Sequence, residues 1–172
     1  NARTGSPSNR TVATAFNVTV YATDAEFNTR TQDSTTSVTI AVTGEAFESS
    51  DSPITVGAGI ATFSVTDNTA GSGFTVDASN TGSYTLQASS AYTVNPGAAS
   101  RTIAILPGQT HVPGAATYGA AVTGTPTATN ADNTFVATIR AVDSRFNTNS
   151  TFEGNITIDT TVDVDDTETA NT

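Results

Sequence analysis

One segment of the sequence occurs twice, and this internal repeat constrains the fold more than any other feature. Residues 16–29 read FNVTVYATDAEFNT and residues 135–148 read FVATIRAVDSRFNT, with seven of the fourteen positions identical. The two copies lie 119 residues apart, whereas the repeats of solenoids and propellers recur about every 20–50 residues. We therefore expect each copy to belong to a separate domain.

Alternating apolar and polar residues predict β-strands through the first 106 residues. Phe16, Val18, Val20 and Ala22 alternate with polar residues, which is the period of a half-buried strand. Similar patterns are centred on Val38–Val42, Ala61–Val65, Phe74–Val76, Tyr84–Ala88 and Ile103–Ile105. Threonine supplies 36 of the 172 residues, and Lys and Met are absent, which favours strands over helices. The chain is thus predicted to be all-β, with about seven strands in about 100 residues, as in immunoglobulin-like antiparallel β-sandwiches.

The repeat also predicts the domain boundaries. Residues 1–106 hold a full set of strands that ends at Ile103–Ile105, and Pro107-Gly108 begins a Pro/Gly-rich connection. Residues 107–172 are expected to form the first half of a second sandwich, with strands at 135–142 and 154–161. The remaining strands of this second repeat would come from a continuing chain or from a neighbouring copy, as in strand donation.

The order of these segments resembles the bacterial immunoglobulin-like repeats of invasin, intimin and filamin-like type. The resemblance rests on the A-x-D-x-x-x-N turn, the VTI strand, and the GIATFSV and GSYTLQA segments. It implies tandem sandwiches in an extracellular stalk, spacer or surface lattice such as an adhesin or a surface layer. One departure concerns Phe27 and Phe146, which stand where such repeats usually carry Gly before the Asn.

Charge and composition exclude several classes of function. Six basic and sixteen acidic residues give a net charge of -10, so the surface repels nucleic acid and anionic lipid. No apolar run approaches the roughly 18 residues that span a bilayer, so we expect no direct membrane insertion in this segment. Disulfides and thiolate metal sites are excluded because the chain has no Cys.

Two sets of oxygen-bearing side chains are candidates for a calcium site. Asp24 and Asn28 recur as Asp143 and Asn147 in the repeated motif, and carboxylate and amide oxygens are ligands that Ca²⁺ accepts. The alternative is a turn held by these side chains. A second candidate is the acidic run that contains Asp163 and Asp165, for which a solvated acidic loop is the alternative. No cofactor is expected to be required.

Four Asn-x-Ser/Thr sequences are candidate glycosylation sites, at Asn9, Asn17, Asn149 and Asn155. The Thr-rich surface offers O-linked attachment as an alternative. No catalytic residue is assigned, because the chain lacks G-x-S-x-G and HExxH motifs and its single His111 lies in the Pro/Gly connection. We therefore predict a protein that is not an enzyme.

The leading functional hypothesis is a structural module of an extracellular surface protein, in a surface layer, a filament or an adhesin stalk. Its expected partners are copies of itself or neighbouring repeats. The alternatives are a module that binds a glycan or a host protein, and a spacer domain in a large extracellular hydrolase. The absence of Trp and the small number of Tyr residues place glycan binding behind the structural role.

Overall fold

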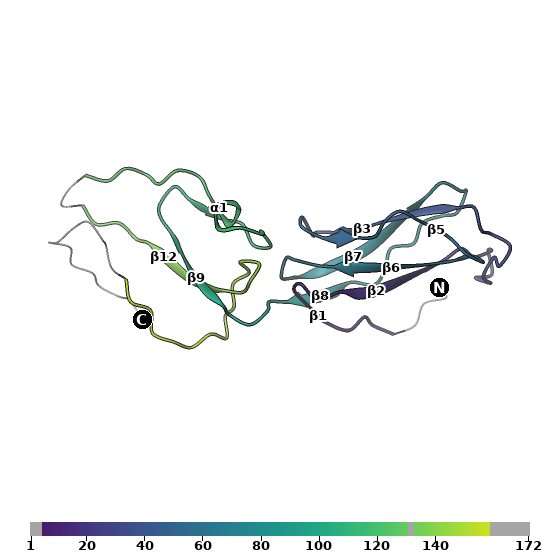
Figure 1. Ribbon diagram of the computed structural model, residues 1–172, viewed down its shortest axis with the longest axis horizontal. Helices are drawn as coiled ribbons and strands as arrows, with labels where there is room; N and C mark the ends of the chain where they lie inside the picture. Colours follow the sequence, from purple (N-terminus) through teal and green to yellow (C-terminus); the bar gives the residue numbers. More distant parts are fainter. Residues whose placement is uncertain (1–4, 131–132, 159–172) are drawn as a thin grey trace.

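The computed structural model describes residues 5–130 and 133–158 and shows an all-β protein. The strands form two bodies that lie end to end (Figure 1), and the only helix of the described part is the single turn α1 (Tyr118–Ala121). Each body has its own cluster of buried apolar side chains. We call residues 5–96 the first body and residues 97–158 the second body.

Two sheets face each other in the first body. Its strands are β1 (Arg10–Thr11), β2 (Phe16–Tyr21), β3 (Ser37–Thr43), β4 (Ser49–Ser50), β5 (Ile54–Thr55), β6 (Ile60–Thr66), β7 (Gly71–Asn80) and β8 (Tyr92–Asn95). One sheet has the order β2-β6-β4 and the other has the order β1-β8-β7-β3-β5. Side chains from both sheets meet in one core that extends from Val12 to Val94.

The strands form where the predicted alternation is regular. In β3, Val38, Ile40 and Val42 are buried while the residues between them are exposed. In β6, Phe63 and Val65 are completely buried, and such residues each contribute about 1.5–3 kcal/mol by leaving water. The predicted strands around residues 16–22, 38–42, 61–65 and 74–76 are confirmed.

The strand predicted at Tyr84–Ala88 is wrong, because residues 81–91 form an irregular segment. Hydrogen bonds of Tyr84 divert the chain there: its hydroxyl donates to Asp33 at 2.6 Å, and its carbonyl accepts from the Asn80 side chain at 3.1 Å. The side chain of Leu86 consequently remains exposed. The neighbour of β7 is instead β8, which the sequence analysis missed and whose Tyr92 and Val94 enter the core.

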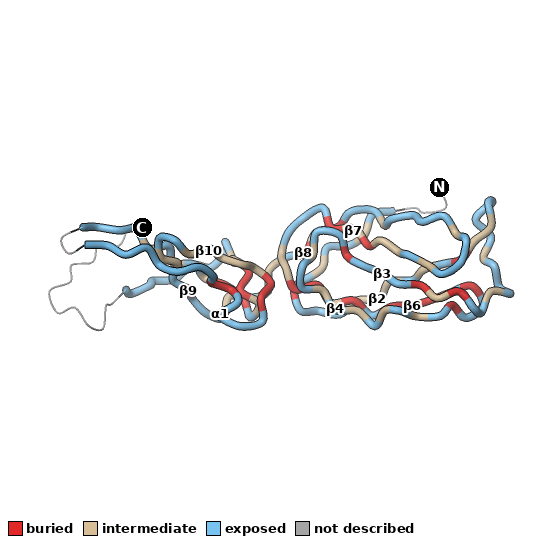
Figure 2. Tube along the Cα trace, turned by 90° about the horizontal axis from the view of Figure 1, so that it is seen from above, coloured by how far each residue is buried: buried red, intermediate tan, exposed pale blue. Residues whose placement is uncertain are grey.

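The second body is smaller and its elements are short. They are β9 (Arg101–Ile105), β10 (Thr110–His111), α1, β11 (Val122–Thr123) and β12 (Thr138–Val142). β9 pairs antiparallel with β12, and β10 pairs antiparallel with β11. Its buried positions gather at the end that adjoins the first body (Figure 2).

Two predictions about the second repeat need correction. The strand at 101–105 was expected to close the first repeat, but it pairs with β12 and its Ile103 lies in the second core. The first core therefore ends before residue 97, earlier than the boundary predicted at residue 106. Of the strand predicted at 154–161, residues 154–158 are not in a strand, and 159–161 lie outside the described residues.

Candidate functional site

The repeated Asp and Asn of the second body form a turn that the chain holds by local hydrogen bonds. Oδ1 of Asp143 accepts the backbone N–H groups of Arg145 at 2.8 Å and Asn147 at 3.0 Å. Phe146 has a φ of 59°, a left-handed conformation that favours glycine. This position is where the resemblance led us to expect Gly, and the left-handed backbone explains that expectation.

The same turn contacts the end of the first body through the buried side chain of Asn147. The amide of Asn147 accepts the N–H of Ala70 at 2.8 Å and donates to the carbonyl of Asn68 at 2.9 Å. Within the second body, Oδ2 of Asp143 accepts the N–H of Gly97 at 2.8 Å, next to the connection between the bodies. Asp143 and Asn147 are each only 1% exposed, so these bonds are shielded from water. We call this set of contacts the junction.

Further residues around the junction hold the turn in place. Nδ2 of Asn149 donates to the carbonyl of Gly97 at 2.8 Å, and Nε2 of His111 lies 2.7 Å from the carbonyl oxygen of Phe146. Gly114 donates its N–H to Arg145 and has a φ of 87°, and a side chain there would collide with Thr69 and Phe47 of the first body. His111 therefore belongs to the packed end of the second body.

The first body carries the same turn at its opposite end, without a partner body. Oδ1 of Asp24 accepts the N–H groups of Glu26 at 3.1 Å and Asn28 at 2.8 Å, and Phe27 has a φ of 67°. The hydrogen bond from the Asn28 side chain is the main cause that lowers the pKa of Asp24. Asn28 is exposed and Phe27 is 48% exposed, whereas their counterparts Asn147 and Phe146 are buried.

The calcium candidates are separated into these two turns. Asp24 lies beside Asn28, and Asp143 lies beside Asn147, with each carboxylate accepting hydrogen bonds from its own turn. Residues 5–130 and 133–158 contain no group of three or more His, Cys, Asp or Glu residues placed to hold a metal ion. Asp163 and Asp165 lie outside the described residues, and calcium binding stays a prediction.

The glycosylation candidates differ in the exposure and the hydrogen bonding of their side chains. Asn9, Asn17 and Asn155 are exposed. The Nδ2 atom of Asn149, to which a glycan would be attached, instead donates to Gly97, and Oδ1 of Asn149 accepts from Thr151. A glycan on Asn149 would therefore replace one of the two hydrogens of the nitrogen that bonds Gly97, close to the junction.

Buried acidic residues also lie at the end of the first body that carries the junction. Asp67, 1% exposed, accepts a hydrogen bond from the Tyr92 hydroxyl at 2.9 Å, while its Oδ1 has no hydrogen-bond partner. Burial raises the pKa of Asp67 above its ordinary value. Burial likewise raises the pKa of Glu48, and Asp67 adds a smaller repulsive contribution there. The sequence analysis did not identify these two residues.

We expect the first body to become more stable as the pH falls from about 7 to about 5. A carboxyl whose folded pKa is raised contributes stability below its unfolded pKa, and this contribution is lost as the pH rises through the folded pKa. Asp67→Asn should raise the free energy of unfolding at neutral pH by roughly 1 kcal/mol and flatten the pH dependence, since a buried charge is removed. Urea unfolding followed by tyrosine fluorescence at both pH values measures this.

Asp33 supplies the control with the opposite sign. The hydroxyl of Tyr84 is the main cause that lowers the pKa of Asp33, so its contribution to stability is lost only as the pH falls below its ordinary value of 3.8. Asp33→Asn should therefore leave the slope between about pH 7 and 5 unchanged. A slope that is identical in the parent and in Asp67→Asn would contradict the assignment to Asp67.

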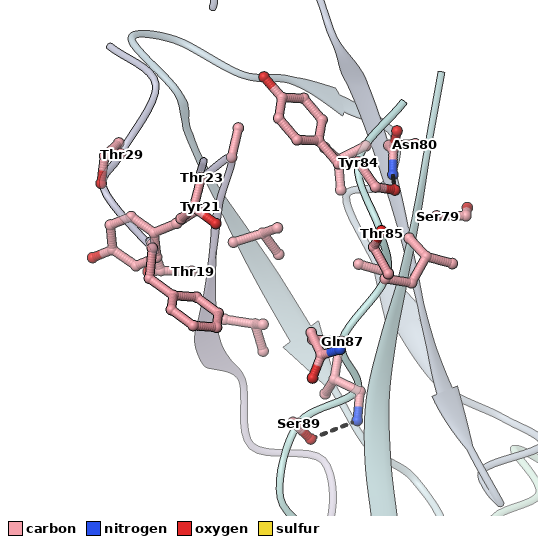
Figure 3. Close-up of a pocket in the computed structure, with 18 of the residues that line it drawn as sticks. Thr19, Tyr21, Thr23, Thr29, Ser79, Asn80, Tyr84, Thr85, Gln87 and Ser89 are labelled. Carbon is pink, nitrogen blue, oxygen red and sulfur yellow. Dashed lines mark hydrogen bonds between the residues drawn. The ribbon is translucent and has the colours of Figure 1, made fainter. Parts of the chain in front are cut away.

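A groove opens along β2 in the first body, with a volume of about 710 Å³. Its walls carry Thr19, Tyr21 and Thr23 on the side of β2, and Tyr84, Thr85 and Gln87 on the side of the irregular segment (Figure 3). The apolar side chains that line it include Val18, Val20, Val38, Val76 and Phe27. Phe27 links the groove to the exposed Asp24–Asn28 turn.

Comparisons with known proteins identify no relative: no protein-family model, no curated protein and no solved structure matches this chain. Within the described residues, no helix has the length and apolar character needed to cross a membrane.

Proposed function

We propose that this chain is a non-catalytic structural module of an extracellular surface protein, in which immunoglobulin-like β-sandwich repeats are joined in series. The observation that carries the proposal is the junction. Asn147 uses both ends of its amide on Asn68 and Ala70. A two-point contact of this kind resists rotation of one body against the other, which a spacer or stalk requires.

The energetics of the junction support a defined arrangement of the two bodies. Asn147 makes two hydrogen bonds to Asn68 and Ala70 of the first body, and Asp143 makes a third to Gly97 beside the connection. Each hydrogen bond of a buried group contributes roughly 1 kcal/mol, and bonds to a charged group contribute more. The connection between the bodies is also short, since the first core ends at Val94 and β9 begins at Arg101.

The arrangement of strands in the first body supports an immunoglobulin-like repeat. Such folds pair strands B, E and D in one sheet and strands C, F and G in the other. The sheet β2-β6-β4 has the order expected of B-E-D, and β3, β7 and β8 have the order expected of C-F-G. The parallel pairing of the short β1 with β8 agrees with an N-terminal strand that crosses to the second sheet.

The acidic surface and the repeated turn favour copies of itself or neighbouring repeats as partners outside the cell. A net charge of -10 without any Lys keeps such a module soluble and away from nucleic acid. Protease treatment of intact producing cells tests the location, and we expect the protein to be digested while cytoplasmic proteins are spared.

The spacer role predicts a single arrangement of the two bodies in solution. Because the chain has no Cys, spin labels can be placed at the exposed positions Thr62 on β6 and Thr138 on β12 through Thr62→Cys and Thr138→Cys. Electron–electron double resonance should give one narrow distance distribution in the full chain. Asn147→Ala should broaden it, because the two-point contact is lost.

Asn28→Ala is the matched control, since Asn28 is the exposed counterpart of Asn147 and should leave the distribution narrow. A broad distribution in the chain without either alanine would mean that the bodies pivot freely. That result would reject the spacer role and favour a flexible tether, as expected for a binding module or an accessory domain.

A further inference from the structure

We infer that the outer end of the first body is the docking site for another repeat of the same kind, whose residues 68–70 and 97–105 would contact β2 and the Asp24–Asn28 turn as those of this chain contact β12 and the Asp143–Asn147 turn. This docking site rests on the proposed function as a series of repeats, and it is the contact that the first repeat would make with the repeat before it. The observation behind it is the difference between two copies of one sequence motif. In the copy at 135–148 the turn residues Asp143, Phe146 and Asn147 are buried, whereas Phe27 and Asn28 of the copy at 16–29 are exposed.

The free edge of β2 is the first part of this docking site. In the second body, β9 pairs with β12 in the register Ile105 to Thr138 and Ile103 to Arg140. The equivalent residues of the first body are Thr19 and Tyr21. In the described part of the chain β2 pairs with β6 alone and lies at the edge of its sheet.

The backbone directions show that the free edge of β2 is the one that β9 uses on β12. Val142 accepts a hydrogen bond from Ser100, next to β9, and its counterpart is Thr23. Ala22 bonds to Gly59, next to β6. Adjacent residues of a strand direct their backbone groups to opposite edges. Thr23 and Tyr21 therefore face away from β6, towards the position where a β9-like strand would lie.

The groove beside this edge has the chemistry that a β9-like strand requires. Ile103 of β9 is buried in the second core together with Phe146. The matching groove is lined by Val18, Val20 and Phe27, so apolar side chains of an incoming strand would enter it while its backbone pairs with β2. Addition of a strand at an exposed edge combines main-chain bonds with side-chain pockets in this way.

The Asp24–Asn28 turn is the second part of the docking site. Its internal hydrogen bonds match those of Asp143 and Asn147. The turn is therefore already formed before any partner arrives. What it lacks is a preceding repeat that offers the counterparts of Asn68, Ala70 and Gly97. A preceding repeat that also supplied the counterparts of Ile103 and Ala115, which lie in the core with Phe146, would cover Asn28, Phe27 and the free edge of β2.

The partner is a preceding repeat, because the segments of this chain that could fill the docking site already bind elsewhere. Residues 68–70 contact Asn147, and β9 pairs with β12. The end of β2 with the Asp24–Asn28 turn and the 67–70 turn lie at opposite ends of β6, since Tyr21 pairs with Ile60 and Phe16 pairs with Val65. A body with one contact at each end extends in series.

The test is a joined chain in which residues 1–119 precede the full 172-residue sequence, which reproduces the 119-residue spacing of the natural repeat. Amide hydrogen exchange is measured at Tyr21 and Thr23 of the downstream copy. In the single chain these amides should exchange quickly, and in the joined chain about a hundredfold more slowly. Their counterparts Arg140 and Val142 serve as the internal standard of a paired edge.

Substitutions in the upstream copy alone test the proposed occupant. Ile103→Thr with Ile105→Thr should remove the protection of Tyr21 and Thr23, whereas Thr102→Ser, at an exposed position of the same strand, should preserve it. The downstream standards Arg140 and Val142 should not change in either variant, because their own β9 is unaltered.

Three results would overturn the inference. They are equal exchange in the single and joined chains, slow exchange already in the single chain because its own N-terminal segment fills the groove, and protection that survives loss of both isoleucines. The spin-label distances between Thr62 and Thr138 in the single chain test the spacer role separately. A narrow distance distribution with an unprotected β2 edge would reject only the docking site. A broad distance distribution with a protected β2 edge would reject only the spacer role.

Discussion

Asp143→Ala is expected to loosen the turn that carries the junction and to lower the free energy that keeps residues 97–149 folded by about 3–5 kcal/mol. The carboxylate accepts N–H groups of Gly97, Arg145 and Asn147 while only 1% exposed. Its removal leaves the buried N–H of Asn147 and the partly buried N–H groups of Gly97 and Arg145 without this partner. An unsatisfied buried donor costs roughly 1–3 kcal/mol. Hydrogen exchange resolved by peptide should show faster exchange in β9 and β12, with β3 and β7 unchanged.

Asp24→Ala is the control for this loss. Asp24 makes the same bonds within its turn but has no counterpart of the bond to Gly97, and its bonds are exposed, so water can satisfy the groups it leaves. A clearly smaller effect is expected, confined to residues 22–30. Equal losses for the two variants would show that the turn alone, and not the junction, accounts for the stability.

The second large effect is expected at the two phenylalanines with left-handed backbone. Phe146→Gly should destabilise the second body by about 2–4 kcal/mol, because a side chain that is 1% exposed leaves the core. Phe27→Gly should be neutral or stabilising by up to about 1 kcal/mol, because it relieves a φ of 67° while removing a half-exposed ring. Thermal unfolding of both full-length variants measures the difference.

The direction of the change in stability caused by Phe27→Gly shows whether the Phe27 ring is packed in the single chain. A marked loss of stability in Phe27→Gly would mean that this ring packs in the single chain as Phe146 does. Phe27→Ala separates the two causes, since it removes the ring without offering the conformational freedom of glycine. We expect this alanine variant to be no more stable than the parent.

The fold was predictable where alternation and burial coincide. Val38, Ile40 and Val42 lie on one face of a strand that is buried on that face only, so the period alone identifies it. Leu86 follows the same pattern, yet the hydroxyl of Tyr84 reaches Asp33, 51 positions away in sequence. Local periodicity contains no information on such a contact. The sequence pattern therefore predicts a strand at this segment, and the strand does not form.

Strand partners were harder to predict than strands. Ile103 and Ile105 were correctly assigned to a strand, but sequence proximity favoured the first repeat as its partner. Pairing with β12 joins residues that are 33 positions apart or more, across a connection with its own short elements. Only the open edge of β12 in three dimensions decides between the two partners.

Only the turn residues of the candidate site could be predicted from the sequence. Asp143 and Asn147 stand out because they recur as Asp24 and Asn28. Their partners are the N–H groups of Ala70 and Gly97 and the carbonyl of Asn68. Every residue has a backbone carbonyl, and every residue except proline has a backbone N–H. Backbone groups leave no signature in a sequence, so the turn was identified while the surface that receives it was not.

This reliance on main-chain atoms affects how such a chain can change over evolutionary time. Because Asn147 contacts only the backbone of Asn68 and Ala70, substitutions there that keep the course of the turn leave both hydrogen bonds available. Repeats joined in this manner can drift in surface chemistry, be duplicated or be exchanged in order without loss of their fit. The side chains that must persist for these bonds are the Asp and the Asn of the incoming turn, and Gly114 must stay without a side chain beside Thr69 and Phe47.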